Sequence, residues 1–475
     1  VDRLAARADN AVVVGRLEGC RVFRRWQRGR FDDRARLVDA RPRGPGKQRL
    51  REALQVPDGL VVASQPLAQL AGTQPGLQLE PLEARREGRL ESLEALQQAA
   101  ARHGFFWPPD PTSAAVCTVG GNLAYNSAGP RAVKYGTPRD NTLGLKAVTG
   151  TGTTIRTGTR TSKGVVGYDL TRLLIGSEGT LAVITEAILK LTPLQPARRM
   201  LRAEYRDMHA AAAAVANIMA RPVTPCALEF MDGNAIQMVR SEVPSDLHPD
   251  AGALLIIEMD GMESQLDDIS AEIAQAAQVE GTLSIRRAQT PQDAAALWDV
   301  RKALSPALRR VAPKKINEDV VVPVSRMPDL VDRLADLSQR HRIRIVNFGH
   351  AGNGNLHVNL LYDPHDPAQK QRADACLEDV FAAVLEMDGT ISGEHGIGLV
   401  KRDWVARELD ATSLAIMHAI KRQFDPAGIL NPGKALPVGE CAWADPPPVP
   451  TEIRVSRRDL TVTAPATASV AEVQD

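Results

Sequence analysis

The sequence predicts an α+β protein of two domains, and two patterns carry this prediction. Residues 198–286 alternate between strand and helix patterns in the order strand, helix, strand, strand, helix, strand, which predicts an antiparallel sheet covered by helices. Further on, a strand pattern at Ile345 leads into Gly-Asn-Gly at 352–354 and then into alternating apolar positions up to Leu360, which predicts a hairpin. At 475 residues the chain is long enough for two or three domains with cores of their own.

Composition divides the chain into four parts. Residues 1–90 are an anomalous, Arg-rich segment in which no periodicity lasts, so no function can be inferred from it. Residues 91–197 and 198–437 carry regular patterns and are expected to form the two domains. Residues 438–475 are rich in Pro, Thr and Ala and are predicted to be a disordered tail.

Charge and cysteine content exclude several classes of function. The net charge of +1 offers no electrostatic basis for binding nucleic acid or an anionic membrane. The five cysteines are far apart and form no CxxC motif, which argues against an iron–sulfur cluster and favours a reducing, cytoplasmic location. No apolar run is long enough to predict a membrane span.

Two glycine-rich stretches place imidazoles where packing alone offers no reason for them. The predicted hairpin would bring His350 and His357 side by side on neighbouring strands, about 5 Å apart at their Cβ atoms. Glu394, in Ser-Gly-Glu-His-Gly at 392–396, supplies a carboxylate. Two His and one carboxylate suit a catalytic divalent metal. The alternative is a Gly-rich turn with two buried, hydrogen-bonded histidines.

The first domain carries loops that suit a nucleotide. A stiff Pro-Pro-Asp-Pro segment at 108–111 precedes Gly120-Gly121-Asn122, where paired glycines allow close backbone approach to a ligand. A second glycine-punctuated segment covers residues 174–184. Gly-Thr-Gly at 150–152 lacks the third glycine of a dinucleotide fingerprint and is predicted to be a hairpin turn.

The second domain adds charged groups on regular elements. Asp207 is expected to cap a helix that ends at Met219. Thr290 is expected to cap a helix that carries Arg301, and Lys315 precedes a strand predicted at residues 320–322. Further helices are predicted at 327–341 and 368–387.

From about residue 90 to 437 these motifs, in this order, resemble the FAD-linked 2-hydroxy-acid dehydrogenases and oxidases of the vanillyl-alcohol-oxidase type. The similar subgroup contains D-lactate dehydrogenase, D-2-hydroxyglutarate dehydrogenase and the glycolate oxidase flavin subunit. The resemblance implies a two-domain flavoprotein with an FAD-binding α+β domain, atypical in its N-terminal part, and a C-terminal α+β substrate or cap domain on an antiparallel sheet. It also implies FAD and a divalent metal (zinc, manganese or iron) as cofactors.

The resemblance assigns roles to individual residues. The implied metal ligands are His350, His357 and Glu394. The implied base is His395, and the implied substrate contacts are Arg301, Asn359 and Lys315. The implied FAD contacts are Pro109, Gly120, Gly121, Asn122, Asn126, Glu178, Gly179, Ile184 and Asn431.

One family feature is missing. The family carries a glycine-rich segment, broadly Arg-Gly-x-Gly-x-Gly, that wraps the FAD pyrophosphate upstream of the Pro-Pro-Asp-Pro segment. Residues 43–47 are a poor match because Pro45 lacks a backbone donor.

The predicted function is FAD-dependent oxidation of a D-2-hydroxy acid of the lactate, glycolate or 2-hydroxyglutarate class to the 2-oxo acid. Two alternatives stay open: an oxidase that uses oxygen, and a flavin-poor or inactive relative that acts as a partner subunit. The electron acceptor is left unassigned, and a homodimer or a partner subunit is allowed.

Overall fold

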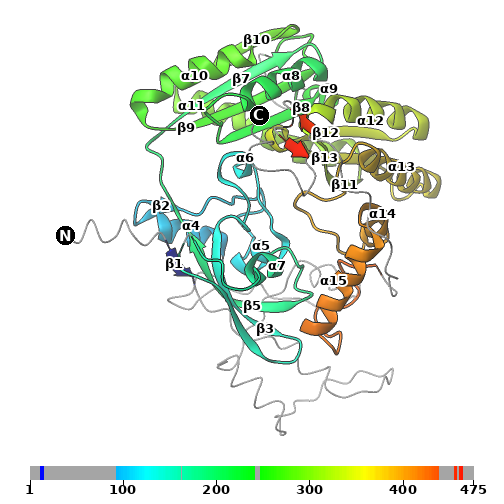
Figure 1. Cartoon of the computed structure of the whole chain (residues 1–475). Helices are drawn as coiled ribbons and strands as arrows, with labels where there is room; N and C mark the ends of the chain where they lie inside the picture. Colours follow the sequence, from blue (N-terminus) through cyan, green and yellow to red (C-terminus); the bar gives the residue numbers. More distant parts are fainter. Residues whose placement is uncertain are drawn as a thin grey trace.

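The computed structural model describes residues 11–14, 92–161, 163–240, 247–437, 454–456, 459 and 461–463. Figure 1 shows two domains, with the first in cyan and teal and the second in green to yellow. The expectations for residues 1–90 lie outside the described residues except at β1 (Ala11–Val14), which pairs antiparallel with β5. No helix in the described ranges is long and apolar enough to cross a membrane.

The first domain is built on a four-stranded sheet in the order β1-β5-β3-β4. The bounds of its other strands are Thr142–Thr149 for β3, Thr154–Gly158 for β4 and Ala182–Lys190 for β5. A hairpin turn joins β3 to β4 at residues 150–152, which confirms the prediction. A small second sheet pairs β2 (Phe105–Phe106) with β6 (Thr192–Pro193).

Helices cover one apolar core in this domain. Their bounds are Leu93–Ala101 for α4, Val119–Tyr125 for α5 and Leu170–Leu174 for α7. The short helix α6 (Ala132–Tyr135) has no buried residue. Ser92 caps α4 by accepting a hydrogen bond from the backbone N–H of Ala95. The core contains the fully buried side chain of Trp107, which directly precedes the stiff Pro-Pro-Asp-Pro segment.

The second domain is built on a seven-stranded antiparallel sheet in the order β10-β7-β9-β8-β12-β13-β11. Its strand bounds are Ala197–Tyr205 for β7, Ala227–Asp232 for β8, Ala253–Gly261 for β9, Thr282–Arg287 for β10, Lys314–Val321 for β11, Arg344–His350 for β12 and Asn355–Tyr362 for β13. The predicted strands and helices from β7 to β10 occur in the predicted order, but an unpredicted helix lies between β8 and β9.

Helices cover both faces of this sheet, so the domain has three layers. One face packs against α8 (Met208–Met219), α10 (Glu263–Ala277), α12 (Met327–His341) and α13 (Pro367–Glu386). The other face packs against α9 (Gly233–Arg240) and α11 (Pro291–Val311). Asp207 caps α8, and Thr290 forms a capping box with Asp293 at the start of α11, as expected.

Some elements differ from the predictions. Helix α9 was not predicted. Strand β11 begins at Lys314, six residues before the predicted start at Val320. The prediction missed the first half of the strand because this half is mostly polar and lacks an apolar run. Short turns follow, with the bounds Val324–Arg326 for η2, Ala351–Asn353 for η3, Arg402–Trp404 for η4 and Val405–Glu408 for α14.

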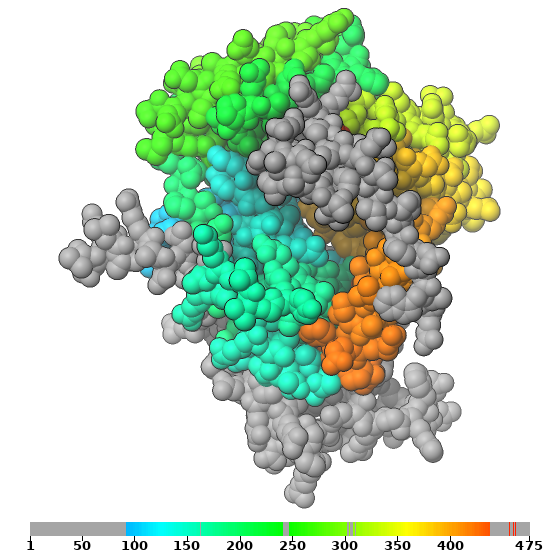
Figure 2. All heavy atoms as spheres, in the orientation of Figure 1, coloured from blue at the N-terminus to red at the C-terminus, as the bar shows by residue number. Residues whose placement is uncertain are grey.

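The C-terminal helix α15 (Ala411–Phe424) returns to the first domain, although residues 198–437 were expected to form the second. Phe424 packs against the first core, and its carbonyl accepts a hydrogen bond from the N–H of Gly150 (2.9 Å). Lys421 Nζ lies 2.7 Å from the carbonyl oxygen of Thr180. In Figure 2 this helix, in orange, adjoins the teal surface of the first domain.

Part of the predicted disordered tail is ordered. Strands β14 (Arg454–Ser456) and β15 (Thr461–Thr463) form an antiparallel pair. Between them Asp459 accepts hydrogen bonds from the backbone N–H (2.9 Å) and hydroxyl (2.8 Å) of Ser325. The prediction of disorder is therefore wrong at these residues, and the rest of 438–475 lies outside the described residues.

Candidate active site

The predicted hairpin is formed by β12 and β13, but its register differs from the expectation. His350 lies opposite Asn355, and His357 lies opposite Phe348, so the two histidines are diagonal neighbours rather than direct partners. They still converge on one face, with ring centroids 5.2 Å apart and nearly perpendicular planes. Gly354 makes the turn possible, because it has φ +69° and an added Cβ would collide with the carbonyl oxygen of Val322.

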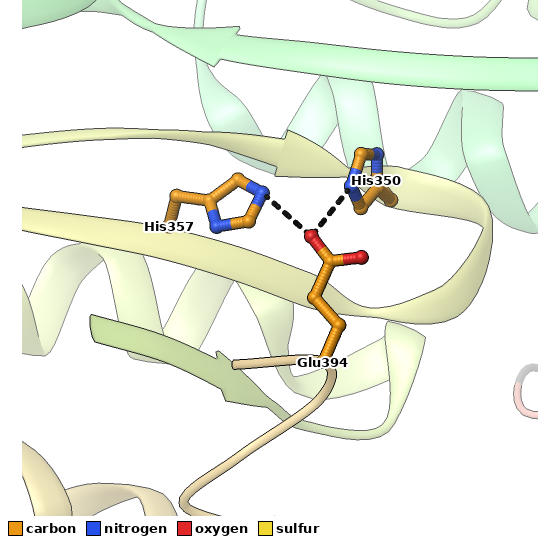
Figure 3. Close-up of side chains that lie close together, drawn as sticks. All are labelled: His350, His357 and Glu394. Atoms are coloured by element: carbon orange, nitrogen blue, oxygen red, sulfur yellow. Dashed lines mark ion pairs between the residues drawn. The ribbon is translucent and has the colours of Figure 1, made fainter. Parts of the chain in front are cut away.

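Glu394 completes the predicted trio (Figure 3). Its Oε1 lies 3.5 Å from Nε2 of His350 and 3.6 Å from Nε2 of His357. One ligand atom from each of the three residues falls within 4.8 Å of the others, and all three side chains are at most 12% exposed. The second carboxylate oxygen of Glu394 accepts a hydrogen bond from the backbone N–H of Gly129 (3.0 Å) in the first domain. The trio therefore lies where the two domains meet.

The pKa values of the two imidazoles are shifted in opposite directions. Burial alone lowers the pKa of His350, but the negative charges of Glu229 and Glu394 outweigh burial and raise this pKa to about 10. Burial and the neighbouring positive charge of His350 lower the pKa of His357 to about 3. The Nε2 of His350 and the Nδ1 of His357 are buried and have no hydrogen-bond partner among the described residues. A buried imidazole nitrogen without a hydrogen-bond partner, next to a carboxylate, is a set of ligand atoms that a divalent cation could bind.

Arg301 and His350 share a partner that the sequence did not reveal. Glu229 of β8 lies opposite His350 in the sheet and is only 1% exposed. Its carboxylate hydrogen-bonds Nδ1 of His350 through one oxygen and lies 3.2 Å from Nε of Arg301 through the other. The Arg301 guanidinium also stacks over the Phe348 ring at 4.3 Å. Arg301 is thus held within the site by these contacts, and its side chain is mostly buried.

His395 lies beside the trio. Its ring stacks on His357 with centroids 5.3 Å apart, and its side chain is 36% exposed. The Nδ1 of His395 lies 3.4 Å from Oδ1 of Asp319, a fully buried residue of β11. Asp319 also accepts hydrogen bonds from the backbone N–H groups of Glu394 and His395. Of the two ring nitrogens of His395, Nδ1 is therefore the one that contacts Asp319, and a role of His395 as base stays a prediction.

Asn359 and Lys315 contact each other. Nζ of Lys315 lies 3.1 Å from Oδ1 of Asn359. The amide nitrogen of Asn359 donates to the carbonyl oxygens of Val346 (3.1 Å) and His357 (3.0 Å). Asn359 is fully buried, so it positions Lys315 at the edge of the site, and a substrate contact of either side chain stays a prediction.

Two of the predicted FAD contacts, Glu178 and Asn431, are linked to the loop that carries Glu394. Glu178 has φ +54°, and its carboxylate accepts hydrogen bonds from the backbone N–H groups of Ile397 (2.6 Å) and Gly398 (2.9 Å). Asn431 donates its amide to the carbonyl oxygen of Glu178 (2.6 Å). The carboxylate of Glu178 thus ties the first domain to the site loop, and its predicted role on the adenosine side is untested.

The remaining predicted FAD contacts lie at the start of α5 and nearby. Asn122 is fully buried and donates to the carbonyl oxygen of Ser127 (2.8 Å), while its Oδ1 has no donor among the described residues. Asn126 caps α5 with φ +55° and accepts the N–H of Arg139 (3.0 Å). The other predicted contacts are buried (Pro109 and Ile184) or half-buried (Gly120, Gly121 and Gly179).

These segments suit one wall of an FAD site. Gly179 has φ +67° and open space where a Cβ would stand, and the orphaned Oδ1 of Asn122 is an unused acceptor. Ile184 instead packs in the core of the first domain. The region expected to face the pyrophosphate lies outside the described residues.

Comparison with known proteins agrees with this geometry. Residues 194–435 match the C-terminal domain of FAD linked oxidases, and residues 91–158 match an FAD binding domain. The chain is 39% identical over 337 residues to the glycolate oxidase subunit GlcD of Bacillus subtilis, covering 71% of this chain and 72% of that protein. It is 35% identical over 350 residues to the D-lactate dehydrogenase of Anaerostipes hadrus, covering 72% and 74%.

A solved structure shows the same fold. The 4-ethylphenol oxidase from Gulosibacter chungangensis superposes with a TM-score of 0.58 at 18% identity, over 73% of this chain and 75% of the oxidase. The long match in the second domain and the identity to both enzymes lead to one conclusion: this chain belongs to the FAD-linked oxidases.

Proposed function

We propose that the chain oxidises a D-2-hydroxy acid of the lactate, glycolate or 2-hydroxyglutarate class to the 2-oxo acid, with FAD and a divalent cation (zinc, manganese or iron). The observation that carries the proposal is the convergence of His350, His357 and Glu394 beside an exposed His395. The similarity to a glycolate oxidase subunit and to a D-lactate dehydrogenase supports the substrate class.

The cofactors and the two basic side chains have separate roles in this reaction. When bound, FAD supplies a hydride acceptor, and a cation on His350, His357 and Glu394 supplies Lewis acidity that lowers the pKa of a hydroxyl. The guanidinium of Arg301 binds the substrate carboxylate, for which its planar fork is suited. Lys315, held by Asn359, offers a second positive group at the rim of the site.

His395 is the base that removes the hydroxyl proton of the substrate. Oxidation of the alcohol removes two hydrogens: Nε2 of His395 takes the hydroxyl proton, and bound FAD would supply the acceptor for the α-hydrogen and its electron pair. Asp319, 3.4 Å from Nδ1, orients the ring and stabilises the imidazolium that forms.

The test is rapid mixing without oxygen. The full chain, supplied with FAD and with zinc, manganese or iron in turn, is mixed with D-lactate, glycolate or D-2-hydroxyglutarate, and L-lactate serves as the control. Bleaching of the oxidised-flavin absorption by a D-acid or glycolate is the expected result. Absence of bleaching with every acid and every cation would contradict the proposal. Oxygen consumption during turnover distinguishes an oxidase from a dehydrogenase.

A second candidate function rests on a specific observation. The match to the FAD binding domain covers only residues 91–158, and residues 1–90 contain no Arg-Gly-x-Gly-x-Gly segment. This favours a flavin-poor relative that acts as a partner subunit. The glycolate oxidase relative is itself named as a subunit, which supports the existence of a partner. The flavin content of the purified chain separates the two candidates.

A further inference from the structure

Glu229 is a buried carboxylate that contacts two different parts of the site. It lies in β8, pairs across the sheet with His350 of β12, and is only 1% exposed. Its neighbours in the strand, Leu228 and Phe230, are buried apolar residues of the main core. A buried carboxylate lowers stability unless both of its oxygens have charged or hydrogen-bonding partners. The partners of Glu229 therefore indicate its role.

Each oxygen of Glu229 contacts a different functional group. Oε1 accepts a hydrogen bond from Nδ1 of His350, and this fixes the ring tautomer that leaves Nε2 toward Glu394. Oε2 lies 3.2 Å from Nε of Arg301. Glu229 contacts Nε of Arg301. The two terminal nitrogens of the guanidinium therefore stay free of Glu229 for binding a substrate carboxylate.

The second contact of Arg301 strengthens this restraint. The guanidinium lies 4.3 Å above the ring of Phe348, which is two residues before His350 on β12. Arg301 is therefore held from one side by Glu229 and from the face by Phe348, and its side chain is only 12% exposed. Neither Arg301 nor His350 can turn away without leaving the Glu229 charge unpaired in the interior.

We propose that Glu229 is a positioning residue that couples the cation site to the grip on the substrate carboxylate. It holds His350 in its ligand orientation and Arg301 in its substrate-binding orientation at the same time. This inference rests on the proposed function. Because both groups depend on one carboxylate, changes at one site are expected to alter affinity at the other.

The test uses Glu229→Gln, which keeps the size of the side chain and removes its charge. Zn²⁺ affinity of the full chain, measured by chelator competition without substrate, is expected to fall about 10- to 100-fold. The second measurement is calorimetry with a 2-oxo acid: pyruvate, glyoxylate or 2-oxoglutarate, whichever the unaltered chain binds most tightly. The affinity of Glu229→Gln for this acid is also expected to fall. Arg301→Lys is expected to weaken that affinity less in the Glu229→Gln background than in the unaltered chain.

The matched control is Asp232→Asn. Asp232 is a second buried carboxylate of β8, and it accepts hydrogen bonds from the backbone (3.0 Å) and side chain (2.8 Å) of Asn347 on the same neighbouring strand. It makes no contact with His350 or Arg301 that the described residues show. We expect its loss to lower the melting temperature while changing Zn²⁺ affinity less than about twofold.

The outcomes separate this inference from the proposed function. Zn²⁺ affinity unchanged by Glu229→Gln, together with an additive effect of Arg301→Lys, would overturn the role of Glu229 alone. An unaltered chain that binds neither Zn²⁺ nor any of the three 2-oxo acids would overturn the proposed function and this inference with it. If Glu229→Gln fails to fold, Glu229→Asp replaces it: the shortened carboxylate is expected to weaken both affinities, and unchanged values would refute the coupling.

Discussion

The ammonium of Lys401 lies 2.7 Å from Oδ1 of Asp319, and both side chains are buried. Nζ of Lys401 also lies 3.2 Å from Glu318, so one buried cation compensates two neighbouring carboxylates of β11. Asp319 in turn accepts the backbone N–H groups of Glu394 and His395. This ion pair therefore supports the loop that presents both the third ligand of the trio and the predicted base.

Removal of Lys401 is expected to destabilise the protein. Lys401→Met leaves the charge of Asp319 without its buried partner, which typically costs about 3–5 kcal/mol. The measurement is the free energy of unfolding in denaturant. The control is Lys370→Met: Lys370 pairs with Asp374 on the exposed surface of α13, where water and salt screen the charges, so its loss is expected to leave the free energy of unfolding nearly unchanged. Equal effects of the two substitutions would show that burial of the Lys401 pair contributes nothing.

Removal of a histidine of the trio is expected to remove the metal. His350→Ala or His357→Ala leaves two of three ligands, so bound divalent metal and turnover should both fall. Elemental analysis of the purified variants measures the first. His341→Ala is the control, because His341 pairs with Asp379 outside the trio. Normal metal content in both variants of the trio would exclude this assignment.

Loss of the predicted base is expected to affect chemistry and not metal content. His395→Asn should slow flavin reduction by a D-2-hydroxy acid about 10²–10⁴-fold, the usual range for a lost general base. The measurement is stopped-flow flavin reduction with excess FAD, alongside elemental analysis. Reduction at the normal rate would show that another group takes the proton.

A change in the guanidinium of Arg301 is expected to weaken substrate binding. Arg301→Lys keeps the charge but loses the planar fork, so KM should rise. The matched control is Arg333→Lys, since Arg333 pairs with Glu386 on the exposed surface of α12 and should leave KM unchanged. Equal KM values for the unaltered chain and Arg301→Lys would remove Arg301 from the substrate site.

Flavin content decides between an enzyme and a flavin-poor relative. Each lost charge-assisted hydrogen bond to the pyrophosphate costs about 1.5–3 kcal/mol. Loss of two or three would weaken FAD affinity by several powers of ten. We therefore expect the purified chain to show little flavin in its visible spectrum, and an Arg-Gly-x-Gly segment introduced upstream of Leu93 should restore it. A stoichiometric flavin spectrum would show that residues 1–90 supply the missing contacts.

Local patterns determined much of this protein. Glycine at 354, which adopts positive φ, predicted the hairpin, and the side-chain caps Asp207 and Thr290 predicted where α8 and α11 begin. The trio of His350, His357 and Glu394 could be found because imidazoles and a carboxylate in glycine-rich segments have no packing role. Such signals depend on residues close together in the chain.

The tertiary structure decided what supports the site. Glu229 and His350 are 121 residues apart, and Asp319 and Lys401 are 82 apart. Neither pair has a local signature: Glu229 lies in an apolar strand pattern, and its partner depends on β8 pairing with β12. The exact register of the hairpin also placed His350 opposite Asn355 instead of His357. These neighbours are set by the pairing and register of strands that are far apart in the sequence. The register is fixed because the apolar side chains on both faces of the sheet must be buried, and no short stretch of sequence contains that information.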